Sequence, residues 1–159
     1  MKNLTTTRSA WMLAGFVGAA FVAGAIGSAA TFENVRAWYP SLAKPTWNPP
    51  NWIFGPVWTT LYVLMGVAAW RGWRASENAR PLVAAYGAQL VLNALWSILF
   101  FGLKQPTWAL MDIFALWSLL VWLLVRLWRA DRWAGALWLP YVLWVSFATA
   151  LNTAIVRLN

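Results

Sequence analysis

The spacing of the charged residues constrains this chain most strongly. Five stretches carry at most one charged side chain, and they cover residues 9–32, 45–70, 81–103, 105–125 and 133–156. Asp112 is the one charge inside them. A helix needs about 20 apolar residues to cross the hydrocarbon core of a membrane. The spacing therefore predicts an all-α membrane protein, a single domain over 1–159 with transmembrane helices near 10–30, 52–72, 81–102, 107–128 and 133–155.

The connections between these segments indicate how the helices are arranged. Short links join the last four helices, which must therefore be antiparallel neighbours. The first helix is long for a signal peptide and carries Gly15, Gly18, Gly24 and Gly27, which suit close helix packing, so we favour a retained helix. One connection, 31–51, is long and rich in proline and tryptophan. Such a stiff loop is expected to form a lid over one mouth of the bundle.

Lysine and arginine side chains are distributed unequally between the two ends of the predicted helices. Eight lie on the side of the N-terminus and four on the other side; the eight are Lys2, Arg8, Arg71, Arg74, Arg80, Arg126, Arg129 and Arg132. Positive residues favour the cytoplasmic side. The sequence thus predicts an N-terminus inside and a C-terminus outside.

Composition removes several classes of function. The chain has no Cys and no His, so thiolate and imidazole chemistry is excluded, and neither a metal site nor a bound cofactor is expected. The net charge is +8, but no basic stripe interleaves with aromatics outside the spans, so lipid headgroups are expected as partners rather than nucleic acid. The 15 Trp residues are the other unusual feature.

Polar residues inside the predicted spans are candidates for a binding site, because polar groups are costly in hydrocarbon. Four helices each carry a stripe of aromatic and hydrogen-bonding residues at helical spacing. The stripes are Trp58, Tyr62 and Met65; Gln89, Asn93 and Ser97; Trp108 and Asp112; and Tyr141, Trp144, Ala148 and Asn152. If they converge, they form an apolar pocket with a few orienting polar groups, as a small-molecule site requires.

A purely structural interpretation of the same residues stays open. Gln89, Asn93 and Asn152 also suit hydrogen bonds between helices. Asp112 also suits an ion pair with Lys104 near the membrane surface. Tryptophans at predicted helix ends suit interfacial belts, and these are Trp70, Trp73, Trp128, Trp133 and Trp138.

Specific motifs run through nearly the whole chain. Residues 44–52 read KPTWNPPNW and residues 55–62 read GPVWTTLY, and later come LN at 92–93, WALMD at 108–112 and PY at 140–141. In this order they resemble the translocator protein family, also called the TspO/MBR or tryptophan-rich sensory protein family. The family's C-terminal sterol motif is incomplete here, because Thr153 stands where it has an aromatic residue. The chain is more similar to a bacterial-type member.

The resemblance implies a five-helix bundle, generally a homodimer, that binds porphyrins, sterols or benzodiazepine-site ligands beneath the first long loop. By matching motif, Trp58 and Asn93 would contact the ligand through polar groups, and Asp112 would face the same cavity. The implied walls are Tyr62, Trp108, Trp144 and Ala148. Trp38 and Trp144 match tryptophans connected with light-dependent porphyrin breakdown, and Ala84 and Ala88 match a small-residue dimer motif.

Three functions follow as alternatives for an integral, multi-pass membrane protein. The first is binding, with sensing or transport, of a tetrapyrrole such as protoporphyrin IX or of a related hydrophobic ligand. The second is light- and oxygen-dependent porphyrin degradation through Trp38 and Trp144. The third is a membrane scaffold whose pocket only holds lipid. The first is preferred, because aromatic rings, amides and one carboxylate suit holding a ligand better than reacting with it.

Overall fold

The computed structural model describes residues 6–159 and is helical throughout its regular structure. Five helices within these residues are long and apolar enough to cross a membrane, as the charge spacing predicts. They are α1 (Thr6–Thr31), α3 (Phe54–Ala75), α4 (Arg80–Ser97), α5 (Pro106–Ala130) and α6 (Arg132–Leu158). A π-helical turn, η3 (Ile98–Gly102), extends α4. The protein is therefore an integral, multi-pass membrane protein.

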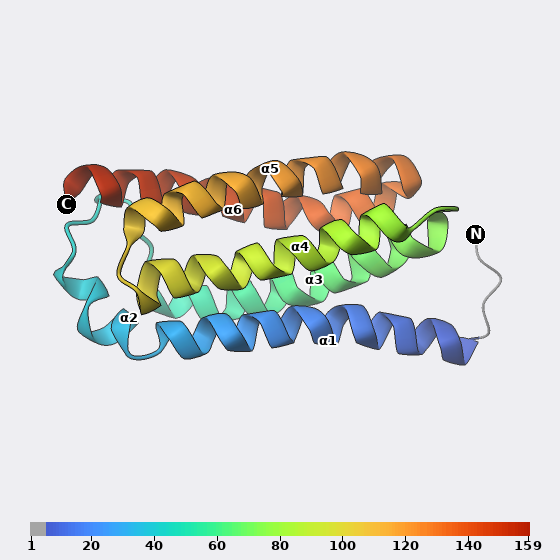
Figure 1. The fold of residues 1–159 in the computed structure, drawn as a ribbon, viewed down its shortest axis with the longest axis horizontal. Coiled ribbons are helices and arrows are strands. Elements are labelled where there is room, and N and C mark those ends of the chain that lie inside the picture. The colour runs from blue at the N-terminus through green and yellow to red at the C-terminus, as the bar shows by residue number, and fades with distance from the viewer. Residues whose placement is uncertain (1–5) are drawn as a thin grey trace.

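The five long helices form a closed ring of neighbours. Around the ring, α1 packs on α3, α3 on α6, α6 on α5, α5 on α4 and α4 on α1. The odd number of crossings places the start of α1 and the end of α6 at opposite ends of the bundle (Figure 1). Three of the expected spans lie inside α1, α5 and α6. The span expected over 81–102 is made up of α4 and η3, and the span expected over 52–72 starts in a 3-10 turn, η2 (Asn51–Ile53), before α3 begins at Phe54.

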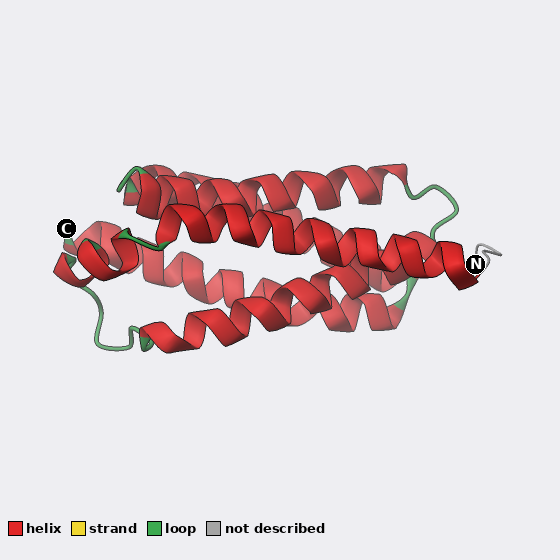
Figure 2. Cartoon of the chain, turned by 90° about the horizontal axis from the view of Figure 1, so that it is seen from below, coloured by secondary structure: helices red, strands yellow, loops and turns green. Residues whose placement is uncertain are grey.

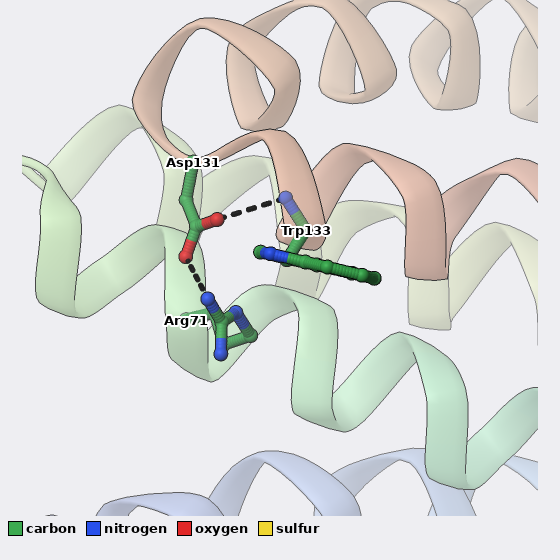
Figure 3. A network of polar contacts seen from close by, with 3 residues as sticks. All are labelled: Arg71, Asp131 and Trp133. Atoms are coloured by element: carbon green, nitrogen blue, oxygen red, sulfur yellow. Dashed lines mark hydrogen bonds and ion pairs between the residues drawn. The ribbon is translucent and has the colours of Figure 1, made fainter.

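Local sequence explains several of the helix boundaries. Pro106 stands in the first turn of α5, where its missing N–H leaves no hydrogen bond unmade. The turn between α5 and α6 is fixed by Asp131, whose side chain accepts a hydrogen bond of 2.8 Å from the Trp133 N–H and caps α6. The other Asp131 carboxylate oxygen lies 2.7 Å from the Arg71 guanidinium of α3 (Figure 3). This ion pair joins the turn to α3 at the end of the bundle that carries most of the Lys and Arg residues, which we call the basic end.

The interior is filled by leucine, alanine and aromatic side chains. Leu120, Leu123 and Leu127 of α5 are almost completely buried. Trp138 is also fully buried and donates a hydrogen bond of 3.1 Å to the Leu120 carbonyl. Its prediction as an interfacial tryptophan is therefore wrong: it lies on the buried face of α6. Trp133, by contrast, is 70% exposed at the start of that helix.

The long connection forms a cap over the end of the bundle that carries the C-terminus (Figure 1). We call residues 32–53 the lid; it contains a short helix, α2 (Asn34–Ala37), and two 3-10 turns, η1 (Tyr39–Ser41) and η2. The Tyr39 hydroxyl donates to Asn48 Oδ1 at 2.7 Å. Lys44 Nζ donates to the carbonyls of Tyr39, Pro40 and Leu42. Burial raises the pKa of the Tyr39 hydroxyl.

Candidate functional site

A cavity of about 530 Å³ lies beneath the lid, between all five long helices. Four residues of the lid also line it, and they are Phe32, Val35, Tyr39 and Asn51. Its volume falls in the range of ~300–1,000 Å³ typical of small-molecule sites. The cavity is therefore large enough for a polycyclic ligand.

Aromatic rings form most of the cavity wall. Trp58 and Tyr62, one turn apart on α3, stack with ring centroids 5.5 Å apart and an interplanar angle of 29°. On α6, Trp144 meets Phe54 edge-on at 5.9 Å and Phe147 at 5.6 Å. All five residues line the cavity. Flat aromatic walls favour a flat aromatic ligand, because offset stacking and edge-to-face contacts add to the burial of apolar area.

A buried hydrogen-bond chain lies alongside this wall. Asn93 Nδ2 donates to the Tyr141 hydroxyl at 2.9 Å, and that hydroxyl donates to Gln89 Oε1 at 2.9 Å. Gln89 Nε2 points at the Met65 sulfur, 3.9 Å away. A thioether is only an acceptor, so the sulfur favours the Gln89 N–H over its oxygen and sets the direction of the chain. Of these residues only Asn93 borders the cavity, and its amide is therefore held in a fixed orientation.

Some of the other polar groups at the cavity form hydrogen bonds within the protein, and others form none with the described residues. The Trp96 indole N–H donates to Asn152 Oδ1 at 3.1 Å, and Asn152 Nδ2 donates to the Pro106 carbonyl at 2.9 Å. These amide contacts join helices. The indole N–H groups of Trp58 and Trp144 form no hydrogen bond with any described residue. They remain available to an acceptor group on a ligand.

The structure brings five of the predicted binding residues together at the cavity. These residues are Trp58, Tyr62, Asn93, Trp144 and Ala148, and they come from α3, α4 and α6. Trp38, proposed with Trp144 for porphyrin chemistry, belongs to the lid but does not line the cavity. It packs edge-on against Phe100, with centroids 5.8 Å apart. Trp38 therefore supports the cavity wall from behind.

Two predicted residues on α5 lie elsewhere. Trp108 is 59% exposed and does not line the cavity, contrary to its expected role as a wall. Ala109 is completely buried, and successive residues of a helix are rotated by about 100°, so Trp108 points away from the buried face. Asp112 is buried but also lies outside the lining. Among the described residues it forms no ion pair with Lys104, and its Oδ2 has no hydrogen-bond partner.

Helix α1 also contributes to the cavity wall, which the sequence did not predict. Gly24 and Gly27 line the cavity together with Phe21, Ala25 and Ser28. A Cβ added at Gly27 would lie 3.0 Å from the Ser97 hydroxyl of α4. The glycines of α1 suggested close packing, but a small side chain gives no sign of which face borders a ligand. Only the position of α1 in the ring shows that face.

Comparison with known proteins agrees with this architecture. The model of the TspO/MBR family matches residues 16–158. The chain is 44% identical to the tryptophan-rich protein TspO of Archaeoglobus fulgidus, over 86% of this chain and 89% of that protein. It is 42% identical to the tryptophan-rich sensory protein of Cereibacter sphaeroides, with 77% of each chain covered. It is 37% identical to the human translocator protein over 91% of this chain and 82% of that one. The family match and the relatives both extend over most of the sequence, and the chain belongs to the TspO/MBR family.

Proposed function

We propose that this membrane protein binds a flat, hydrophobic, polycyclic ligand of the tetrapyrrole class, such as protoporphyrin IX, in the cavity beneath the lid. The observation that carries the proposal is the aromatic wall formed by α3 and α6 around about 530 Å³ of space. A macrocycle fits this wall because its two faces are apolar and its edge carries polar groups. The names of the relatives, sensory protein and translocator protein, agree with binding as the first step.

The polar groups of the cavity suit the polar edge of such a ligand. Trp58 and Trp144 each offer an indole N–H. Asn93 offers the second N–H of its amide, since the first is donated to Tyr141. These groups are expected to bind a carboxylate or carbonyl oxygen. A hydrogen bond to a charged group is worth about 1.5–3 kcal/mol. The polar contacts thus set the orientation of the ligand, and stacking against the walls supplies most of the affinity.

The direct test is an equilibrium titration of the purified protein with protoporphyrin IX in the dark, followed by quenching of indole fluorescence. We expect saturable binding. Trp58→Phe should weaken it at least about tenfold, because an aromatic ring is kept, although a smaller one, and the loss of one hydrogen bond to a charged group costs roughly 1.5 kcal/mol. Trp117→Phe is the control, because Trp117 bonds to Ser146 and does not line the cavity. The absence of saturable binding would contradict the proposal and favour a scaffold that holds lipid.

The same sample distinguishes binding from degradation. Under illumination in air, loss of the porphyrin absorption that disappears with Trp144→Phe would support the enzymatic alternative. Trp144 lines the cavity and Trp38 does not, so direct contact with the ligand is available to only one of the two. We therefore propose binding without degradation. Porphyrin absorption that stays constant in light is the expected result.

We also propose that the protein forms a homodimer through α4. Ala84 and Ala88 are exposed on one face of this helix, and Gly87 lies between them. A Cβ added at Gly87 would meet no atom within 4 Å. Small residues on a lipid-facing surface allow two helices to approach closely.

A further inference from the structure

The cavity is closed on most sides but has exposed residues in its wall. The exposed members on the long helices are Phe21, Ala25 and Ser28 of α1, and Gly55 and Thr59 of α3. All the lining residues of α4, α5 and α6 are buried or half-buried. We call the space between these five residues the lateral opening. It faces the side of the bundle where lipid would lie.

Contacts between α1 and α3 explain where this opening begins. A Cβ added at Gly66 would lie 2.7 Å from the Cα of Val17, so the two backbones nearly touch there. One turn further, the rings of Phe21 and Tyr62 pack at 5.7 Å. Gly24 of α1 also lies against the Tyr62 ring, because a Cβ there would overlap it. Beyond Gly24, no hydrogen bond or ring contact joins residues 25–31 of α1 to residues 54–61 of α3 in the described chain. Figure 2 shows the two helices diverging toward the end that carries the C-terminus.

The neighbouring seam between α1 and α4 remains closed over the same length. The Tyr86 hydroxyl donates to the Phe16 carbonyl at 2.7 Å. Further along, a Cβ added at Gly102 would meet Ala30 at 3.6 Å, which is ordinary van der Waals contact. Thus α1 follows α4 to the lid and separates only from α3.

Helix α6 is also in contact with both of its neighbours, α3 and α5. Phe54 and Trp144 join α3 to α6 at the level of the cavity. Trp117 and Ser146 join α5 to α6 through a hydrogen bond of 2.8 Å. Of these four pairs of neighbouring helices, only α1 and α3 lack such a contact beneath the lid, among the residues that the structure describes.

The depth of the lateral opening places it within one leaflet. From Thr31 at the end of α1 to Ala25 is six residues, or about 9 Å of helix. The hydrocarbon core is about 30 Å thick, so the opening stays within the half of the core nearer the lid. A hydrophobic ligand dissolved in this leaflet meets the cavity without entering water.

We propose that the ligand enters and leaves the cavity sideways from the lipid, through the lateral opening between α1 and α3, while the lid stays closed. This inference rests on the proposed function, since it describes the route to that site. The lid is held shut at its far end, where Asn159 forms hydrogen bonds of 3.0 Å with both the N–H and the carbonyl of Ala43. A sideways route leaves these bonds intact.

Thr59 and Thr60 provide a matched test. Both are exposed, and each hydroxyl donates a hydrogen bond of 2.9 Å to the carbonyl four residues earlier, but only Thr59 lines the cavity. The variants Thr59→Trp and Thr60→Trp are placed in phosphatidylcholine nanodiscs, and protoporphyrin IX binding is followed in the dark by stopped-flow fluorescence. A bulky ring at the opening should slow association and dissociation about tenfold for Thr59→Trp, a barrier increase of roughly 1.4 kcal/mol. Thr60→Trp should bind at the rate of the unchanged protein.

Further variants keep the test decisive. Ala25→Trp narrows the opening from its other side and should also slow association, whereas Ala19→Trp, exposed on α1 but outside the lining, should not. Trp47→Ala removes the lid ring that packs on Phe147 at 5.7 Å, and should leave the rate unchanged. Equal rates for Thr59→Trp and Thr60→Trp, or faster association with Trp47→Ala, would overturn the lateral route while saturable binding upholds the proposed function. Absence of saturable binding in the unchanged protein would overturn both.

Discussion

Replacement of Tyr141 by Phe tests the buried hydrogen-bond chain beside the cavity. The Tyr141 hydroxyl accepts from Asn93 and donates to Gln89, each at 2.9 Å. Phe keeps the ring, whose packing on Trp138 has a centroid distance of 5.5 Å. Only the hydroxyl and its two hydrogen bonds are lost.

The magnitude follows from the number and burial of those bonds. Hydrogen bonds between membrane helices contribute about 0.6 kcal/mol on average and up to about 1.7 kcal/mol. Two lost bonds therefore lower the free energy of unfolding by about 1–3 kcal/mol. We expect the upper half of this range, because Gln89 is completely buried and its remaining partner, the Met65 sulfur, is a weak acceptor. Asn93 borders the cavity and is able to bond to a ligand instead.

Unfolding in mixed micelles of dodecyl maltoside and sodium dodecyl sulfate, followed by helical circular dichroism, measures the effect. Tyr86→Phe is the matched control: it loses a single hydroxyl bond of 2.7 Å, to the Phe16 carbonyl, and should cost roughly half as much. The double variant Tyr141→Phe with Gln89→Met removes the orphaned amide as well and should be no less stable than Tyr141→Phe alone. The reasoning would be refuted if the stability losses of Tyr141→Phe and Gln89→Met add fully in the double variant. It would also be refuted if Tyr141→Phe costs less than Tyr86→Phe.

Changes at four other positions follow from the site and the bundle. Ala148→Thr adds two heavy atoms to the cavity wall and should weaken protoporphyrin IX about threefold to tenfold in a dark titration, whereas unchanged affinity would contradict this wall. Trp108→Leu should leave that affinity unchanged, because its ring lies outside the cavity. Asp131→Asn keeps the helix cap but loses the ion pair with Arg71, which is partly exposed, and should cost under about 1 kcal/mol of unfolding free energy; Asp131→Ala loses both and should cost roughly 1–2 kcal/mol. Ala88→Trp should convert a detergent-solubilised dimer to monomer in light scattering, with helicity retained; a persistent dimer would exclude α4 as the interface.

The helices were predictable because their signal is long and simple. Charged residues such as Arg71 and Arg80 interrupt the apolar sequence at the membrane surface, and the ends of the observed helices follow them closely. The stripes on α3, α4 and α6 were also predictable, because helical spacing places Trp58 and Tyr62 on one face whatever the tertiary structure. The convergence of these stripes depends on the ring order of the helices, which short links restrict but do not fix.

The errors concern single residues on correctly predicted helices. Trp108 and Asp112 are four residues apart, so they are near neighbours on α5. The buried face is centred closer to Ala109, and this leaves Asp112 at its edge and Trp108 outside it. Trp138 shows the reverse error. It was predicted to lie at the membrane interface because it is near the end of a predicted helix, but it is fully buried. In a membrane both faces of a helix are apolar, so hydrophobic pattern alone does not distinguish the interior from the lipid.

The glycines of α1 show why the cavity itself could not be read from the sequence. Gly66 of α3 lets α1 and α3 touch near Val17, and this contact closes the lower half of the bundle. Toward the lid, Gly24 and Gly27 line the cavity, yet a Cβ at Gly24 would overlap the Tyr62 ring and one at Gly27 would lie 3.0 Å from the Ser97 hydroxyl. The same glycines thus belong both to close helix contacts and to the cavity wall, and the sequence does not distinguish these two roles. The cavity itself arises because α1 and α3 diverge toward the lid, which only the three-dimensional structure shows (Figure 2).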